Sequence, residues 1–214
     1  FGISRGVRLI VPSSNDQMLI GDEVYFVADQ NHVGRAMALF GHEEKEARRI
    51  VIVGGGQIGL SLAHDLEKET PDVRVKLVEL NSDRARYAAQ NLEKTVVLNG
   101  DALDREILIE ANIQNAETIV AVADDDEVNI LTSLLAKRQG CQRAITLINN
   151  SIYGPLLSSL GIDAAVEPKS ITVSTILQHI RRGRIKGVHS LRDGAAEVME
   201  AEALETSSLV GVPI

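Results

Sequence analysis

The chain has 214 residues, a formal net charge of −8 and 44% hydrophobic residues, the composition of an ordinary globular protein. Its acidity argues against nucleic acid or an anionic membrane surface as the main partner. The single cysteine, Cys141, excludes an internal disulfide framework. The sequence contains no run of about 18 apolar residues, so no membrane-spanning helix is predicted.

Residues 1–43 predict the tail of a small α/β module. Short strands are predicted over 7–11 and 22–28, and apolar residues at helical spacing predict a helix over 33–40. These elements bury too little surface to fold alone. Because the chain also begins without Met, we expect a segment of a longer polypeptide. The charged stretch 42–48 suits either a linker or the last turn of the preceding helix.

A glycine-rich turn between a strand and a helix follows. Residues 50–53 are all β-branched, which predicts a buried strand, and Gly54, Gly56 and Gly59 come next in the spacing G-x-G-x-x-G. Apolar residues at helical spacing then continue to Glu67. This order of strand, glycine loop and helix is the context that the dinucleotide-binding fingerprint requires.

Each of these glycines has a predicted task. Gly54 permits the tight turn, Gly56 lets the backbone approach a pyrophosphate, and Gly59 allows the helix to pack closely on the strand. The next predicted strand, 73–79, ends on Glu79, about 20 residues beyond the loop, where an acidic residue binds ribose hydroxyls. This carboxylate would repel a 2′-phosphate, which favours NAD(H) or an adenine nucleotide over NADP(H).

The region from Arg49 to Pro168 alternates strands with helices. Strands are predicted over 50–53, 73–79, 95–99, 118–123, 144–148 and 164–167, and helices with one apolar face over 83–92 and 127–138 among others. This alternation predicts an α/β fold with a Rossmann-like, doubly wound parallel sheet and a ligand at the carboxyl ends of its strands. Arg84 and Arg86 are placed one or two turns into a helix, so we discount them as contacts of a 2′-phosphate.

Acidic residues follow two of the later strands. Asp101 is predicted to cap the next helix, to contact the adenine or ribose, or to do both. The run from Asp124 to Glu127 resembles a metal site, but no histidine or spaced carboxylate accompanies it. We interpret it as negative charge at a helix N-terminus.

Residues 169–214 contain a predicted helix and a basic cluster. Apolar residues from Val173 to Ile180 form one stripe, which packs either on its own domain or on a second copy of the chain. The basic cluster over 179–192 is interpreted as cations at a helix C-terminus, in preference to a phosphate or partner site. A strand-like segment over 196–201 follows.

Five motifs agree in order and spacing with a known family. They are the glycine loop 53–59, Glu79, Asn99–Ala102, Val122–Asn129 and Leu160–Asp163. Together they resemble the RCK, or KTN, nucleotide-binding domains of potassium-transport proteins. The resemblance implies tandem repeats of a Rossmann lobe and a small lobe. Three parts are then expected: the end of one small lobe (1–43), a whole Rossmann lobe (48–168) and the beginning of a second small lobe (169–214).

The resemblance also implies a ligand and a partner. We expect NAD(H), with ATP or ADP as alternatives, and a homo-oligomer, dimer or tetramer, located in the cytoplasm against the inner face of the membrane. There it would gate a membrane-embedded potassium translocator. The binding residues implied are Gly54, Gly55, Gly56, Gln57 and Ile58, with Gly59, for the phosphates, Glu79 for the ribose, and Gly100, Asp101, Ala123 and Asp124 for the walls. Many family members place an Arg in the fifth strand, where this chain has Leu147.

A regulatory binding module is therefore the first hypothesis, and an NAD-dependent oxidoreductase is the alternative. Neither Tyr87 nor Tyr153 is followed by Lys at the fourth position, so the short-chain reductase pair is absent. The histidines His64 and His179 are placed on helices, away from a catalytic position. We expect no catalytic activity. A lobe with a purely structural role is the third possibility.

Overall fold

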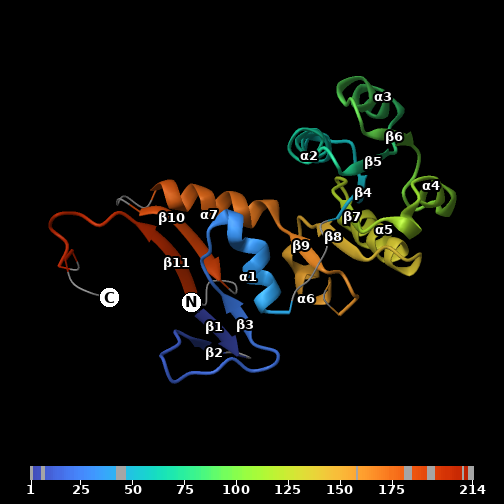
Figure 1. Ribbon diagram of the computed structural model, residues 1–214. Coiled ribbons are helices and arrows are strands. Elements are labelled where there is room, and N and C mark those ends of the chain that lie inside the picture. The colour runs from blue at the N-terminus through green and yellow to red at the C-terminus, as the bar shows by residue number, and fades with distance from the viewer. Residues whose placement is uncertain are drawn as a thin grey trace. The chain divides into compact units, whose positions relative to one another are not determined.

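The computed structural model describes residues 2–5, 8–41, 47–157, 159–180, 185–191, 196–208 and 210–211. The chain divides into two compact units, whose elements are labelled in Figure 1. The sheet unit is Glu46–Thr172, and the terminal unit combines Phe1–Lys45 with Val173–Ile214. Most of the predicted linker, 42–46, lies outside the described residues.

The sheet unit contains six parallel strands in the order β6-β5-β4-β7-β8-β9. They are β4 (Arg49–Val53), β5 (Arg74–Glu79), β6 (Val96–Asn99), β7 (Thr118–Ala121), β8 (Arg143–Leu147) and β9 (Ala164–Val166). Val53, the last residue of β4, pairs with Val78 on one side and Ala121 on the other. The strand order reverses between β4 and β7, so the predicted doubly wound parallel sheet is confirmed.

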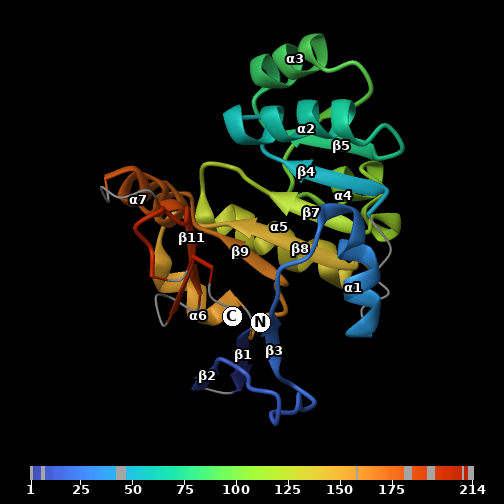
Figure 2. The ribbon, with the colours of Figure 1, turned by 60° about the vertical axis from the view of Figure 1, so that its left-hand side comes forward.

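Helices cover both faces of this sheet. They are α2 (Gln57–Glu69), α3 (Ser82–Asn91), α4 (Arg105–Glu110), α5 (Asp126–Arg138) and α6 (Gly154–Leu157), with 3₁₀ turns η2 (Ile113–Asn115) and η3 (Ser151–Tyr153). Successive side chains of a strand point to opposite faces. Ile52 accordingly joins a core with Ala63 of α2 and Ala88 of α3, which lie together on one side of β4 and β5 (Figure 2).

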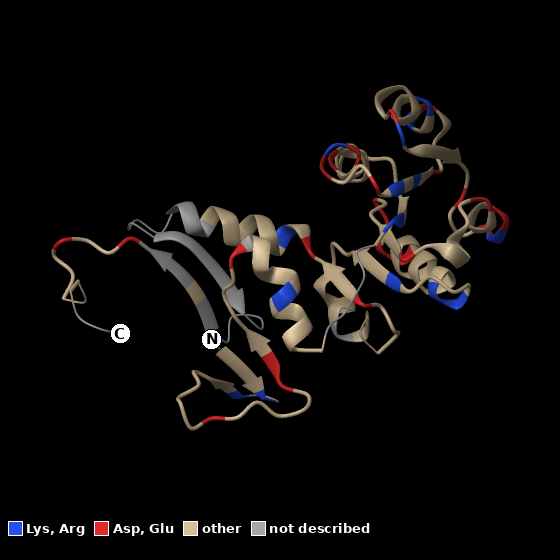
Figure 3. Cartoon of the chain, in the orientation of Figure 1, with Lys and Arg blue, Asp and Glu red and all other residues tan. Residues whose placement is uncertain are grey.

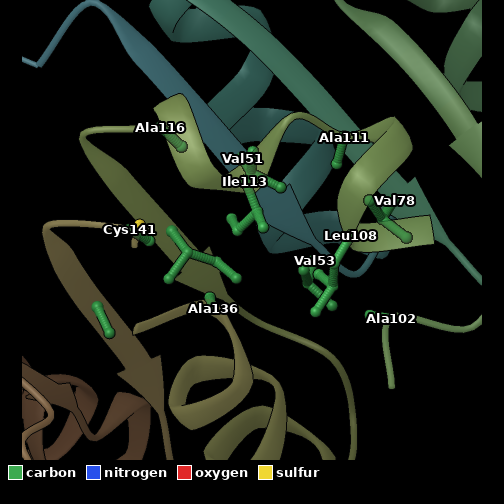
Figure 4. Packing of buried hydrophobic residues seen from close by; sticks show 12 residues of the cluster. Val51, Val53, Val78, Ala102, Leu108, Ala111, Ile113, Ala116, Ala136 and Cys141 are labelled. Atoms are coloured by element: carbon green, nitrogen blue, oxygen red, sulfur yellow. The ribbon is translucent and has the colours of Figure 1, made fainter. Parts of the chain in front are cut away.

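The opposite face has its own core. Val51 and Val53 of β4 pack there with Leu108 of α4 and Ala136 of α5 (Figure 4). The two cores explain why residues 50–53 of β4 are all apolar, since a central strand of a parallel sheet is buried on both faces. Charged residues of both signs occur on each of α2, α3 and α4 (Figure 3). Among the helices of the described residues, none combines the length and the hydropathy needed to cross a membrane.

The terminal unit is mainly antiparallel. Its elements are β1 (Gly2–Arg5), β2 (Arg8–Ile10), β3 (Glu23–Tyr25), η1 (Gln30–His32), α1 (Val33–Leu39), β10 (Ile185–Leu191) and β11 (Ala196–Ala201). The first three strands form a sheet in the order β2-β1-β3, and β10 pairs with β11. The sequence patterns did not predict β1, whose four residues are too few to show alternation.

Helix α7 (Pro168–Ile180) begins in the sheet unit and continues into the terminal unit. Pro168 suits its first position, where no backbone N–H is needed. Val173 and Ile176 of the predicted apolar stripe are 55% and 51% exposed. Arg181–Arg184 and Arg192 of the predicted basic cluster lie outside the described residues.

Candidate nucleotide-binding site

A cavity of about 250 Å³ lies at the carboxyl ends of β4, β5, β6 and β7, where the strand order reverses. In open α/β sheets this crevice is the usual place of a ligand. Seven of the predicted binding residues line it: Gly54, Gly56, Glu79, Gly100, Asp101, Ala123 and Asp124. The fold therefore brings together side chains and backbone from four separate loops.

The glycine loop is shaped by close approaches of the backbone. Gly54 has φ +102°, and a Cβ there would lie 2.7 Å from the backbone nitrogen of Ala123. A Cβ at Gly59 would lie 1.9 Å from the carbonyl oxygen of Gly54, which is the close packing of helix on loop that the sequence predicts. A Cβ at Gly56 would meet no atom within 4 Å. Gly56 therefore presents open space beside the cavity.

Glu79 is held rigidly at the end of β5. Its side chain is 7% exposed, and its oxygens accept hydrogen bonds from the N–H of Gly55 at 2.6 Å and the N–H of Asn81 at 2.7 Å. Gly55 itself does not line the cavity, and its backbone instead fixes the carboxylate that does. An ionised carboxylate offers about four acceptor positions, so capacity for further hydrogen bonds remains.

The loop after β6 forms another wall. Gly100 donates its N–H to the carbonyl of Glu79 at 3.0 Å, and a Cβ at this glycine would lie 2.4 Å from Ile107. The prediction that Asp101 caps the next helix is wrong, because Asp104 caps α4 through the N–H of Glu106. Asp101 accepts instead from the N–H of Leu103 within its own turn, at 2.9 Å.

The loop after β7 is held by a buried amide. Asn129 of α5 is fully buried, accepts from the N–H of Ala123 at 2.8 Å and donates to the carbonyl of the same residue at 2.9 Å. It also donates to the carbonyl of Leu147 at 3.1 Å. Both backbone groups of Ala123 are therefore fixed, and the neighbouring Asp124, whose side chain is exposed, lines the cavity.

Arg84 lines the cavity, contrary to the expectation that it lies too far along its helix. Helix α3 begins at Ser82 behind an Asn81 cap, so Arg84 belongs to the first turn. Its Nη1 donates to Asp124 at 3.3 Å, and its Nε lies 3.9 Å from the carboxylate of Glu79. The other discounted arginine, Arg86, lies outside the lining and pairs with Asp83.

Besides Gly55, three of the predicted residues lie outside the lining of the cavity: Gln57, Ile58 and Gly59. Ile58 lines a separate apolar groove of about 630 Å³ on the α2 side of the sheet, together with Leu147 and Val166. Leu147, at the position where the family resemblance implies an Arg in many members, is a buried leucine that lines this groove and not the cavity.

The acidic run after β7 serves several structural roles. Asp125 caps α5 through the N–H of Val128, and the buried Asp126 accepts from the N–H groups of Asn149 and Asn150. Glu127 accepts from the hydroxyl of Tyr153, and this hydrogen bond raises the pKa of the phenol. Within the described part of the chain, no group of three or more His, Cys, Asp or Glu residues is arranged to hold a metal ion.

Comparison with known proteins supports the family resemblance. The family model described as the TrkA-N domain matches residues 50–168. The Trk system potassium uptake protein TrkA of Azorhizobium caulinodans is 52% identical over 212 residues, covering 99% of this chain and 46% of that protein. This chain thus spans about half the length of the curated relatives that it matches.

Two solved structures share the fold. The structure titled "GsuK channel bound to NAD" is 20% identical, with a TM-score of 0.56 over 75% of this chain and 29% of that chain. The structure titled "Crystal structure of the GsuK bound to ADP" is 25% identical, with a TM-score of 0.52 over 69% and 38%. The family model spans more than half of this chain and matches the parallel sheet from β4 to β9. The chain therefore belongs to the TrkA-N domain family.

Proposed function

We propose that this chain is a nucleotide-binding regulatory part of a potassium uptake system, with NAD(H) as its ligand. The observation that carries the proposal is the cavity at the β4–β7 switch point, where Gly54 and Gly56 lie on one wall and Glu79 on another. The relatives named as potassium uptake proteins support the biological role.

The adenosine half of the ligand would occupy the cavity. Its diphosphate would approach the backbone at Gly56, where no protein atom fills the space, and the N-terminus of α2 would contribute its positive dipole end. Its ribose hydroxyls would donate to the spare acceptor positions of Glu79. A cavity of about 250 Å³ suits a nucleoside, so the rest of a dinucleotide would extend past the β7 loop.

One solved structure of this fold is bound to NAD and another to ADP, which is consistent with an adenine nucleotide in this chain. ATP or ADP is the alternative ligand. The chain acts without catalysis: bound nucleotide is a signal, which shifts the assembly only as far as it binds one conformation better than another. A membrane-embedded potassium translocator receives that signal.

The same proposal places the protein in the cytoplasm at the inner face of the membrane, as a homo-oligomer. The exposed apolar residues Val173 and Ile176 of α7 support association with a second copy, since such a stripe gains free energy when it is covered. The segments 1–43 and 169–214 are proposed as parts of the small lobes that accompany the Rossmann lobe 48–168.

Titration with NADH tests the binding role. Glu79→Ala is expected to weaken NADH binding by about 1–3 kcal/mol, because hydrogen bonds to a charged group are lost. Glu110→Ala, an exposed acid outside the cavity lining, is the matched control and should bind as the wild type does. Equal affinities of both variants would reject the assigned role of Glu79.

A flux assay tests the regulatory role. Membrane vesicles that contain the translocator, supplied with the full-length protein, should take up potassium at a rate that depends on NADH, and Glu79→Ala should reduce this dependence. Uptake that is indifferent to NADH would contradict regulation. Oxidation of NADH by the purified protein with a small carbonyl compound would instead favour the oxidoreductase.

A further inference from the structure

The lining of the cavity has an unbalanced set of charges. Of the side chains that line it, all within the described residues, Arg84 is the only cation, whereas four are carboxylates: Glu79, Asp101, Asp124 and Asp125. A site for a polyphosphate normally balances the phosphate charge with lysine, arginine or a metal ion. This lining has one such group.

That one cation is already engaged. Arg84 donates to Asp124 at 3.3 Å and lies 3.9 Å from Glu79. Its contacts join the first turn of α3 to the β7–α5 loop. Both partners are carboxylates of the cavity lining, so the guanidinium charge is offset before any nucleotide enters.

Asp124 also follows a residue that lies against the glycine loop, the proposed place of the phosphates. It follows Ala123, whose backbone nitrogen would lie 2.7 Å from a Cβ at Gly54. The β7 loop and the glycine loop therefore approach each other closely, and Asp124, the next residue after Ala123, also lines the cavity. Leu147 supplies no compensating charge, since it lines the separate apolar groove.

We propose that Asp124 is a specificity-determining residue, which makes the site select NAD(H) over ATP and ADP. The inference rests on the proposed function of this cavity. The terminal phosphate of ADP or ATP can lose a second proton, and ATP has one phosphoryl group more than NAD(H), so both bring further negative charge towards Asp124, while the cation that would offset it is paired. The diphosphate of NAD(H) carries less charge, and its second ribose offers hydroxyl donors, which a carboxylate accepts.

Calorimetric titrations with NADH, NAD, ADP and ATP, without magnesium and at one ionic strength, test this selectivity. The wild type should bind NADH at least about tenfold more tightly than ATP. Asp124→Asn should narrow the ratio of ATP to NADH dissociation constants by about fivefold, the effect of one unit charge at about 4 Å in water. Asp83→Asn, which removes the same charge from α3 outside the lining, should leave the ratio unchanged.

The salt dependence of the ratio of ATP to NADH dissociation constants provides a second test. A purely structural role of Asp124 would not change this dependence. Because salt screens repulsion between exposed charges, raising the ionic strength should narrow the wild-type ratio and change the Asp124→Asn ratio less. Thermal unfolding of each variant confirms that it is folded.

The outcomes separate this inference from the proposed function. Wild-type protein that binds ATP as tightly as NADH overturns the selectivity while leaving nucleotide binding intact. An Asp124→Asn ratio equal to that of the wild type or of Asp83→Asn overturns the assignment to Asp124. Absence of heat with all four nucleotides defeats the proposed function, and this inference with it.

Discussion

Gly56 and Gly59 of the glycine loop differ in the space around them. Gly59 leaves no room for a methyl group, since a Cβ would overlap the carbonyl oxygen of Gly54. Gly56 has room for one and φ −68°, an ordinary value for any residue. The motif spacing predicts both glycines, but only the structure separates a packing requirement from a requirement of the ligand.

This difference gives a paired prediction. Gly59→Ala should lower the free energy of unfolding by about 1–3 kcal/mol or prevent folding, because the helix must move away from the loop. Gly56→Ala should lower the free energy of unfolding by less than about 1 kcal/mol, because it changes an N-cap glycine that has room for a methyl group. It should nevertheless weaken NADH binding, because the methyl group enters the space proposed for the phosphates. Urea denaturation and NADH titration measure the two effects. Gly56→Ala protein with unchanged affinity would contradict the role of this glycine.

Arg84 shows the limit of prediction from sequence at the level of one residue. The predicted helix begins at residue 83 and the observed helix begins at Ser82, behind the Asn81 cap, so Arg84 lies in the first turn in both. The spacing does not show that a side chain of this first turn reaches the cavity. Helix caps of this kind are set by local hydrogen bonds that residue spacing does not resolve.

The loop between β7 and α5 depends on one buried amide. Asn129 satisfies the N–H and the carbonyl of Ala123, so Asn129→Ala should lower the free energy of unfolding by about 1–3 kcal/mol through groups left unpaired. Thr132→Val in the same helix is the control, because the buried Thr132 hydroxyl has no hydrogen-bond partner. Urea denaturation compares the two variants. Equal midpoints for both would show that Asn129 does not hold the loop.

Helix α2 is joined to the start of β6 by a carboxylate. Glu67 accepts from the N–H groups of Glu93, Lys94 and Thr95 at 3.0, 2.8 and 2.6 Å. Burial opposes ionisation, but these hydrogen bonds outweigh it and hold the pKa of Glu67 below its ordinary value of 4.5. The folded state therefore binds this proton less readily than the unfolded state does.

The stability contributed by Glu67 should depend on pH. Because the folded pKa is depressed, the contribution is present above pH 4.5 and is lost as the pH falls through the folded pKa. Glu67→Gln should lower the free energy of unfolding by about 1 kcal/mol at pH 7, and this difference should shrink in acid. Denaturation curves of both proteins between neutral and acidic pH measure it. A difference that stays constant with pH would contradict the depressed pKa.

The strands of the sheet unit were predictable, since β-branched runs such as 50–53 and 118–120 lie in its buried centre. The short β1 and the turn of Asp101 were not, because four residues show no period and an Asx turn and a helix cap begin with the same residue types. Which residues line each wall of the cavity could not be predicted either, because that depends on the register of four strands.

For the whole molecule, the arrangement of strands determines where binding residues meet. The order β6-β5-β4-β7 brings the glycine loop, Glu79, Asp101 and Asp124 to one edge, although they are far apart in the sequence. Alternation along β8 places Leu147 in the apolar groove, so this position adds no charge to the cavity.

Association with a second copy is a prediction at this scale. Replacing Val173 and Ile176 together by Glu should dissociate a dimer, because two charges would have to be buried in the covered stripe. Ser174→Glu, an exposed neighbour at a different angle around the helix, should leave the dimer intact. Light scattering after size-exclusion chromatography gives the mass of each variant. A wild-type protein that is monomeric at all concentrations would contradict the prediction.

The most direct test of the nucleotide-binding role is an NADH titration followed by backbone amide resonances of the isotope-labelled protein. Binding at the switch point predicts saturable shifts at Gly54–Gly56, Glu79, Gly100–Asp101 and Ala123–Asp124, with the N-terminal end of β4 unaffected. Resonances that do not move, or that move only outside these four loops, would contradict it.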